Sequence, residues 1–113
     1  MKDIDWAREF SVAITVTDSD GKIIYMNDKS GATFGKYGGM DLLGSNLRDC
    51  HKPESWEKIT GLMETNKSNY YTIEKDGIKK LICQAPWYDR GKPAGLVELS
   101  VEIPFVMEHF IRK

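Results

Sequence analysis

The chain has 113 residues, of which 41% are hydrophobic and 29% are charged, and its formal net charge is −1. This composition is typical of one soluble globular domain and excludes a disordered tail. Because the 16 basic and 17 acidic residues are spread over both halves of the chain, we expect no nucleic-acid partner. The apolar runs are far shorter than the ~20 residues of a membrane span, so we expect no membrane partner either.

The N-terminal residues lack the apolar core of a signal peptide, which predicts a cytoplasmic protein. Its two cysteines, Cys50 and Cys83, should then remain reduced thiols. No closely spaced set of cysteine, histidine and acidic residues has the ligand count of a metal site, so we predict no bound metal ion.

A strand, a turn, a second strand and a helix cap follow one another early in the chain. Residues 12–17 alternate apolar and polar side chains, and a second run covers residues 22–26, which predicts two strands. Between them, Asp18-Ser-Asp-Gly21 has the residues of a tight turn. Asn27 then stands where it can cap a short helix over residues 28–34.

This order resembles the start of a PAS domain. The matching motifs are Asp18-Ser-Asp-Gly21, Ile24-Tyr-Met-Asn27 and Met40-Asp-Leu-Leu-Gly44, and the resemblance extends over residues 6–103. It implies an α+β fold with a five-stranded antiparallel sheet in the order 2-1-5-4-3, and with short helices and one longer helix packed on one face. A profilin-like fold is the structural alternative, favoured if the long helix packs on the opposite face.

The middle of the chain predicts short turns followed by the longest helix. Five glycines between residues 31 and 44 break any long helix there. Pro53 suits the first position of a helix, and an apolar stripe that includes Leu62 continues to about Asn66.

Three strands are predicted after this helix. Those over residues 70–75 and 78–88 are joined at Asp76-Gly77, a strong hairpin signal. A third covers residues 97–103, after a turn at residues 89–93.

Both ends of the chain carry apolar residues at helical spacing. Residues 1–10 are predicted to hold an amphipathic helix, and residues 104–113 are predicted to form another. Together with a core over residues 11–103, they make residues 1–113 a single domain.

The apolar strand positions and the apolar stripe of the long helix predict a mainly apolar pocket between sheet and helices. The candidate ligand-binding residues are Ile14, Val16, Phe34, His51, Trp56, Ile59, Met63, Cys83, Ala85, Trp87, Val97, Leu99 and Val101. The alternative is a core filled completely by large side chains, which would leave a protein-interaction domain.

Few residues indicate catalysis or cofactor binding. Cys50-His51 pairs a thiol with an imidazole, but no third orienting group or oxyanion motif accompanies them, so we predict that the chain is not an enzyme. By resemblance to haem-binding PAS domains, His51 is the candidate axial ligand of a haem sensor. The flavin type that uses a cysteine photoadduct is excluded, because Leu47 occupies the cysteine position within Gly44-Ser-Asn-Leu-Arg-Asp49.

The resemblance implies a sensory, signal-transducing module. We predict that it binds a small-molecule ligand or a signalling protein, forms a homodimer, and relays binding through the packing of its terminal helices. No cofactor is required by the sequence, and haem and noncovalent flavin are the cofactors left open.

Overall fold

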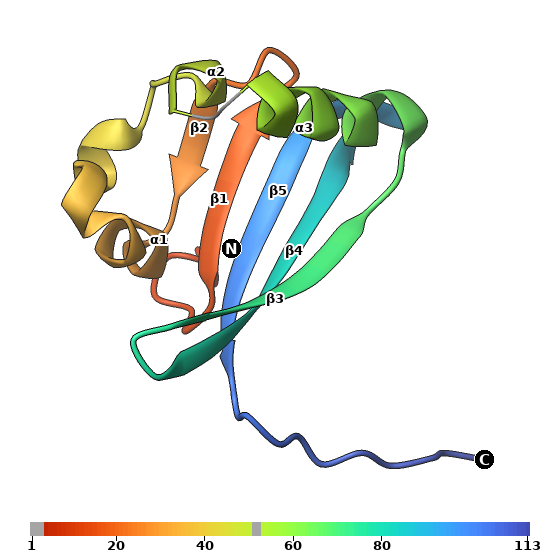
Figure 1. Cartoon of the computed structure of the whole chain (residues 1–113). Coiled ribbons are helices and arrows are strands. Elements are labelled where there is room, and N and C mark those ends of the chain that lie inside the picture. The colour runs from red at the N-terminus through yellow and green to blue at the C-terminus, as the bar shows by residue number, and fades with distance from the viewer. Residues whose placement is uncertain (1–3, 51–52) are drawn as a thin grey trace.

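The computed structural model describes residues 4–50 and 53–113. Its main element is an antiparallel five-stranded sheet with the order β2-β1-β5-β4-β3 (Figure 1), which confirms the predicted topology. The strands are β1 (Ala13–Asp18), β2 (Ile23–Met26), β3 (Asn69–Lys75), β4 (Ile78–Asp89) and β5 (Lys92–Ile103).

The helices lie between β2 and β3 in the sequence, and those that contact the sheet cover one of its faces. They are α1 (Asp28–Thr33), the 3-10 helices η1 (Gly35–Tyr37) and η2 (Gly39–Leu42), α2 (Leu47–Cys50) and the longest, α3 (Pro53–Thr65). In Figure 1, α1 lies near the β2 edge and α3 crosses one end of the sheet. Accordingly, α1 packs on β1, and α3 packs on β4 and β5.

The hairpin β1–β2 forms as predicted. The Asp18 carboxylate accepts hydrogen bonds from the backbone N–H groups of Asp20 and Lys22, at 2.9 and 3.0 Å. Gly21 has φ +86°, a conformation that only glycine adopts without strain. The turn residues therefore act through the mechanism that their sequence predicts.

Asn27 joins several segments and is completely buried. Its side-chain oxygen accepts from the N–H groups of Ser30 and Ile14, both at 2.9 Å. Its side-chain nitrogen donates to the carbonyls of Ala7 and Val12, at 2.9 and 2.8 Å. The predicted helix cap is confirmed, and the same side chain also ties the N-terminal segment to β1.

Two tight turns connect the last three strands, and the β4–β5 pairing also contains a register shift between Trp87 and Tyr88. Asp76 and Gly77, with φ of 53° and 78°, connect β3 to β4, and Arg90 and Gly91, with φ of 53° and 81°, connect β4 to β5. Two-residue loops with positive φ match the twist of antiparallel strands. Residue pairing across β3 and β4 runs without interruption from Asn69 to Lys75.

One face of the sheet, which we call the helix-side face, carries a polar row across four strands. Thr15, Glu98, Gln84 and Asn69 are paired in that order from β1 to β3. The Thr15 hydroxyl lies 2.6 Å from the hydroxyl of Ser30 in α1, which fixes this row on the side of the helices. Residues paired across neighbouring strands share a face, so the helices cover this polar row together with buried apolar residues of the same face, which include Ala13, Ile82 and Leu96.

The opposite face, which we call the open face, is apolar. Because side chains alternate between faces, the row formed by Ile14, Leu99, Cys83 and Tyr70 points away from the helices. Most of its central residues are half-buried. The apolar open-face residues of β1, β4 and β5 are Ile14, Val16, Leu81, Cys83, Ala85, Trp87, Val97, Leu99, Val101 and Ile103.

Trp87 closes one end of the open face. Its indole N–H donates to the carbonyl of Thr17 at 2.8 Å, across the paired residue Gly95. A Cβ atom at Gly95 would overlap that carbonyl and would lie 2.7 Å from the indole nitrogen. Only glycine therefore lets the indole reach β1.

Within residues 4–10, the described part of the predicted N-terminal helix, no helix forms. Residues 6–9 make turns instead, because a segment this short gains little from helical hydrogen bonds alone. The segment is held by the rest of the domain, since the Arg8 side chain donates to the Met26 carbonyl at 2.8 Å. The Arg8 carbonyl also accepts from the N–H of Asp28 at 2.9 Å.

The predicted C-terminal helix over residues 104–113 is also wrong. This segment has no helix and extends away from the sheet after β5 (Figure 1). Its apolar residues are exposed, and Val106 and Ile111 are 88% and 84% accessible. A ten-residue amphipathic helix needs a surface against which to pack, and nothing in the described part of the chain covers this segment.

None of the helices within residues 4–50 and 53–113 is long and apolar enough to cross a lipid bilayer.

Candidate functional site

Most of the predicted pocket residues lie on the open face. The predicted convergence of strand residues toward the helices is wrong, because the apolar side of the alternation faces away from them. Whether these residues contact a ligand or a partner protein stays a prediction. They are Ile14, Val16, Cys83, Ala85, Trp87, Val97, Leu99 and Val101.

Of the other predicted residues, Ile59 and Met63 belong to one buried core cluster. Ile59 lines a cavity under α3, whereas Met63 lines a separate hollow of about 250 Å³. Phe34 is half-buried at the end of α1, and Trp56 packs against the core formed around Ile59. His51 lies outside the described residues.

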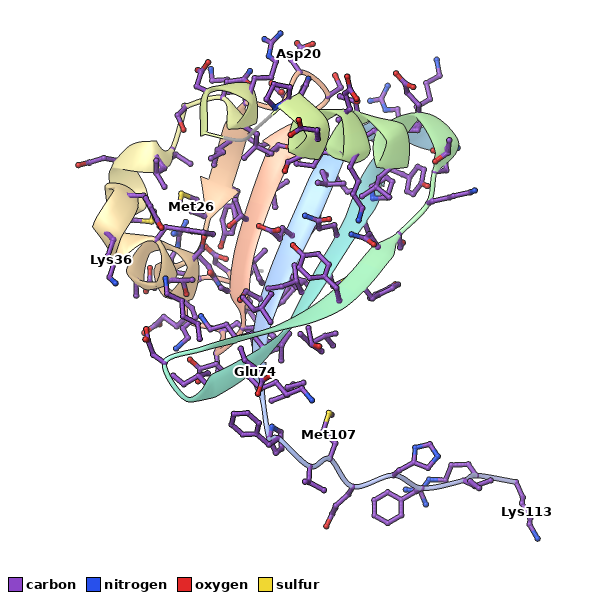
Figure 2. The ribbon with its side chains drawn as sticks, in the orientation of Figure 1. Asp20, Met26, Lys36, Glu74, Met107 and Lys113 are labelled. Carbon is purple, nitrogen blue, oxygen red and sulfur yellow. The ribbon has the colours of Figure 1, made fainter. Side chains whose placement is uncertain are left out.

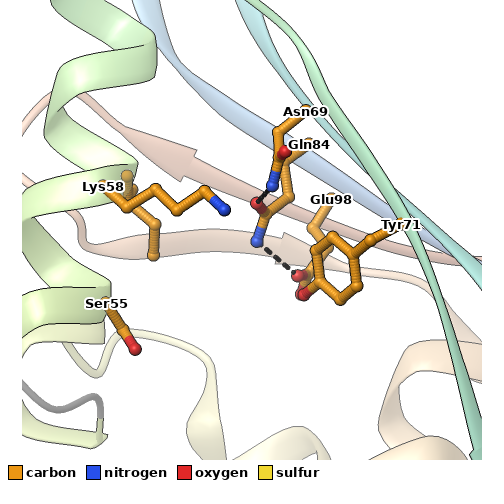
Figure 3. Close-up of a pocket in the computed structure, with 7 residues that line it drawn as sticks. Ser55, Lys58, Asn69, Tyr71, Gln84 and Glu98 are labelled. Atoms are coloured by element: carbon orange, nitrogen blue, oxygen red, sulfur yellow. Dashed lines mark hydrogen bonds between the residues drawn. The ribbon is translucent and has the colours of Figure 1, made fainter.

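The cavity that we take as the candidate site lies between α3 and strands β3, β4 and β5. Its volume is about 280 Å³, close to the lower end of the ~300–1,000 Å³ that is usual for ligand pockets. Figure 3 shows its side chains converging from the helix and the sheet. The lining residues are Ser55, Lys58 and Ile59 of α3, Asn69 and Tyr71 of β3, Gln84 of β4 and Glu98 of β5.

A chain of side-chain hydrogen bonds crosses the floor of this cavity (Figure 3). The Asn69 amide nitrogen donates to the Gln84 oxygen at 3.0 Å. The Gln84 nitrogen in turn donates to a carboxylate oxygen of Glu98 at 3.0 Å. Gln84 is only 8% exposed, so its amide is held in a fixed direction by a partner on each side.

The polar row continues beyond the cavity toward α1. A smaller hollow shares Ile59, Gln84 and Glu98 with the cavity and is also lined by Thr15 and Thr17. Thr15 then contacts Ser30. Buried hydroxyl and amide groups are therefore connected from α1 to β3.

Two ionisable side chains face Glu98 from other elements. Burial, and secondarily the charge of Glu98, raises the pKa of Tyr71 above its ordinary value, so Tyr71 remains a neutral hydroxyl at physiological pH. Lys58 extends from α3 toward the Gln84 amide (Figure 3). The cavity thus holds one ammonium group, one carboxylate, two amides and two hydroxyls.

The sequence prediction missed most of this site, including Lys58, Asn69, Gln84 and Glu98. The apolar–polar alternation along β5 contained a signal for this site, because the polar residues Glu98, Ser100 and Glu102 share one face of the strand. The usual rule assigns the apolar face to the interior. Here the helix layer covers a mixed face, on which this polar row lies beside the buried apolar residues Ala13, Ile82 and Leu96.

The residues described do not fit the cofactors that the sequence left open. The cavity is small and its floor is polar, whereas a porphyrin or flavin needs a large, flat and mainly apolar space. The one histidine in the described part of the chain is His109, in the C-terminal segment that extends away from the sheet (Figure 2). No group of three or more potential metal ligands occurs among the described residues.

No protein-family model and no curated protein sequence matches this chain. Solved structures do match it. The PAS domain of the histidine kinase ThkA gives a TM-score of 0.64 at 22% identity and covers 80% of this chain and 97% of its own. The Aer2 receptor of Vibrio cholerae, a dual PAS-haem oxygen sensor, gives 0.62 at 16% identity over 82% of this chain and 95% of its own.

A third similar structure corrects one expectation. VqmA bound to DPO gives a TM-score of 0.68 at 18% identity and covers 88% of this chain. VqmA of Vibrio cholerae is a dimer that has a target DNA. The expectation that excluded a nucleic-acid partner from the sequence is therefore wrong. Balanced charge in a domain of this fold does not exclude a DNA-binding protein around it.

This chain spans 48% and 55% of two of the VqmA chains that it matches. The matched structures are 16–22% identical to this chain, with TM-scores of 0.61–0.68, so they show its fold. The chain is therefore a PAS-fold domain.

Proposed function

We propose that this PAS-fold domain is a sensory module that binds a small polar molecule in the cavity between α3 and strands β3 to β5. The observation that carries the proposal is the hydrogen-bonded chain of Asn69, Gln84 and Glu98 on the cavity floor. Burying such groups costs stability relative to apolar side chains. Convergent polar groups in a cavity are typical of binding sites, and the similar structures include sensors.

The experiment is a thermal-shift screen of a metabolite collection, with hits measured by calorimetry. We expect a ligand to bind, and we expect Ser55→Trp, which places an indole at the cavity wall, to weaken binding at least about tenfold. The matched control is Glu57→Trp, at an exposed position of the same helix, and it should bind like the wild type. Equal binding by both variants, or no binding by the wild type, would overturn the proposal.

The open face favours a second property, which is self-association. Its central residues on β1, β4 and β5 are apolar, and a patch without charge is complementary to a second copy of itself. Segment 104–113, which follows β5 and extends away from the sheet, carries further exposed apolar residues. We therefore propose a homodimer that pairs open faces.

Sedimentation analysis over a range of concentrations tests this dimer. Leu99→Glu places a charge at the centre of the open face and should leave a monomer, because an unpaired charge in an apolar interface is strongly unfavourable. Ser68→Glu, in the exposed loop before β3, is the matched control and should leave the dimer intact. A wild-type protein that is monomeric throughout would contradict the proposal.

The signal is proposed to pass through β5. Glu98 lines the cavity and Leu99, the next residue, lies on the open face, so one strand contacts both surfaces. A ligand can shift the dimer equilibrium only if it binds monomer and dimer differently. We expect no catalysis, and we retain the cytoplasm as the predicted location.

A further inference from the structure

We infer that the ligand of this cavity is a small zwitterion of the α-amino-acid class, held between Lys58 and Glu98. This inference rests on the proposed function and names the chemistry of its ligand. It is carried by two opposite charges that line the same cavity from different elements, one from α3 and one from β5.

The two charges do not neutralise each other directly. Within the part of the chain that the structure describes, neither Lys58 nor Glu98 forms an ion pair within 4.0 Å. The Gln84 amide lies between them in Figure 3, and it donates to Glu98. A ligand that enters the cavity can therefore contact both charges.

The hydrogen-bond chain determines what Glu98 requires. Because the Gln84 oxygen accepts from Asn69, its nitrogen is the atom that points to the Glu98 carboxylate. That carboxylate accepts one hydrogen bond from Gln84 and has further lone pairs. An ionised carboxylate can only accept, so the ligand group that meets it must donate, and an ammonium group donates with a favourable charge.

Lys58 requires the opposite chemistry. Its ammonium group is a donor and cannot accept, so its best partner is a ligand carboxylate. The Ser55 hydroxyl, on the same wall, can donate to the same group. A neutral ligand would give neither charge an oppositely charged partner, whereas a zwitterion pairs both and keeps the occupied cavity electrically neutral.

The size and the remaining wall agree with this class. A volume of about 280 Å³ accommodates a molecule smaller than a typical drug. Ile59 and the ring of Tyr71 leave an apolar portion of the lining where a short side chain can pack. The uncharged polar groups of Asn69 and Gln84 then supply selectivity among side chains.

The test is calorimetry with the proteinogenic L-amino acids. For the tightest binder, two analogues are added, namely the amine that lacks the carboxylate and the acid that lacks the amino group. We expect the amino acid to bind at least about tenfold more tightly than either analogue, because each lacks one charge-assisted contact.

Charge-removing variants assign each contact. Lys58→Met should weaken binding of the amino acid at least about tenfold and leave the amine unaffected. Glu98→Gln should weaken the amino acid similarly and leave the acid unaffected. Lys67→Met and Glu74→Gln, at exposed positions outside the cavity, are the matched controls and should bind like the wild type.

The outcomes separate this inference from the proposed function. If a metabolite without two opposite charges binds, and Ser55→Trp abolishes its binding, the cavity is a ligand site and the zwitterion inference is wrong. If an amino acid binds equally well to Lys58→Met and Glu98→Gln, the assigned contacts are wrong. If nothing binds the wild-type protein, both proposals fail.

Discussion

The helix-side face and the open face belong to the same strands, yet the helix-side face carries a row of polar residues beside its buried core, whereas the centre of the open face is apolar. On the helix-side face, Gln84 and Glu98 are hydrogen bonded beneath α3. On the open face, the neighbouring residues Cys83 and Leu99 are paired and half-buried, and no helix within residues 4–50 and 53–113 lies over them. Polar groups that converge in a covered cavity indicate a site for a ligand, and an uncovered apolar face indicates a site for a protein.

The largest expected effect concerns the point where Trp87 closes the open face. Gly95→Ala should lower the free energy of unfolding by about 3 kcal/mol or more, because its Cβ would overlap the Thr17 carbonyl. Gly91→Ala, where a Cβ meets open space at φ +81°, should cost only about 1–2 kcal/mol. Urea unfolding followed by circular dichroism measures both. Equal losses of stability for Gly95→Ala and Gly91→Ala would show that the contact between the Trp87 indole and Thr17 does not restrict position 95.

A medium effect is expected on the helix-side face. Gln84→Leu leaves Asn69 and Glu98 without their shared partner and should lower the free energy of unfolding by about 2 kcal/mol. Cys83→Ala, one residue away on the open face, is the matched control and should cost less than about 1 kcal/mol. The same urea experiment decides between them, and a larger loss for Cys83→Ala would reverse our ranking of the two faces.

A triple variant separates binding from stability on the same face. Replacing Asn69, Gln84 and Glu98 together by leucine leaves no unpaired polar partner, so stability should return to within about 1 kcal/mol of the wild type. Ligand binding should be lost. A triple variant that is much less stable than Gln84→Leu alone would mean that the polar chain is mainly structural.

The smallest effect is on the titration of Tyr71. Its raised pKa favours the protonated state in the folded protein, so this group lowers stability as the pH rises above the ordinary tyrosine pKa of about 10. Glu98→Gln should lower the Tyr71 pKa part of the way toward that value, because burial is the larger cause and persists. Absorbance titration of the phenolate, with Tyr71→Phe subtracted, measures the change. No change would exclude an electrostatic contact between the two residues.

The fold was predictable because its signals are local. The Asp18 turn, the Asn27 cap and the Asp76-Gly77 hairpin each act through a few neighbouring residues, and their order indicates the PAS arrangement. The terminal helices were not predictable, because an amphipathic pattern such as residues 104–113 forms a helix only where a surface receives it.

The candidate site was mostly not predictable from one sequence. Period-two alternation shows that Glu98 and Leu99 lie on different faces, but it does not show which face the helices cover. The burial rule favoured the Leu99 side, and the structure places α3 over the Glu98 side. Lys58 was missed for a similar reason, since an exposed lysine on a helix gives no sign of the strand that faces it.

The two-residue turn at Arg90-Gly91 has a consequence for how this domain can change by insertion or deletion. Together with the register shift between Trp87 and Tyr88, it holds β5 against β4 so that Glu98 meets Gln84. One additional residue early in β5 would shift every later side chain to the other face, placing carboxylates outside and leucine and valine under α3. A single-codon insertion would therefore exchange a polar cavity for an apolar one. A single substitution in this strand changes only one side chain and cannot do so.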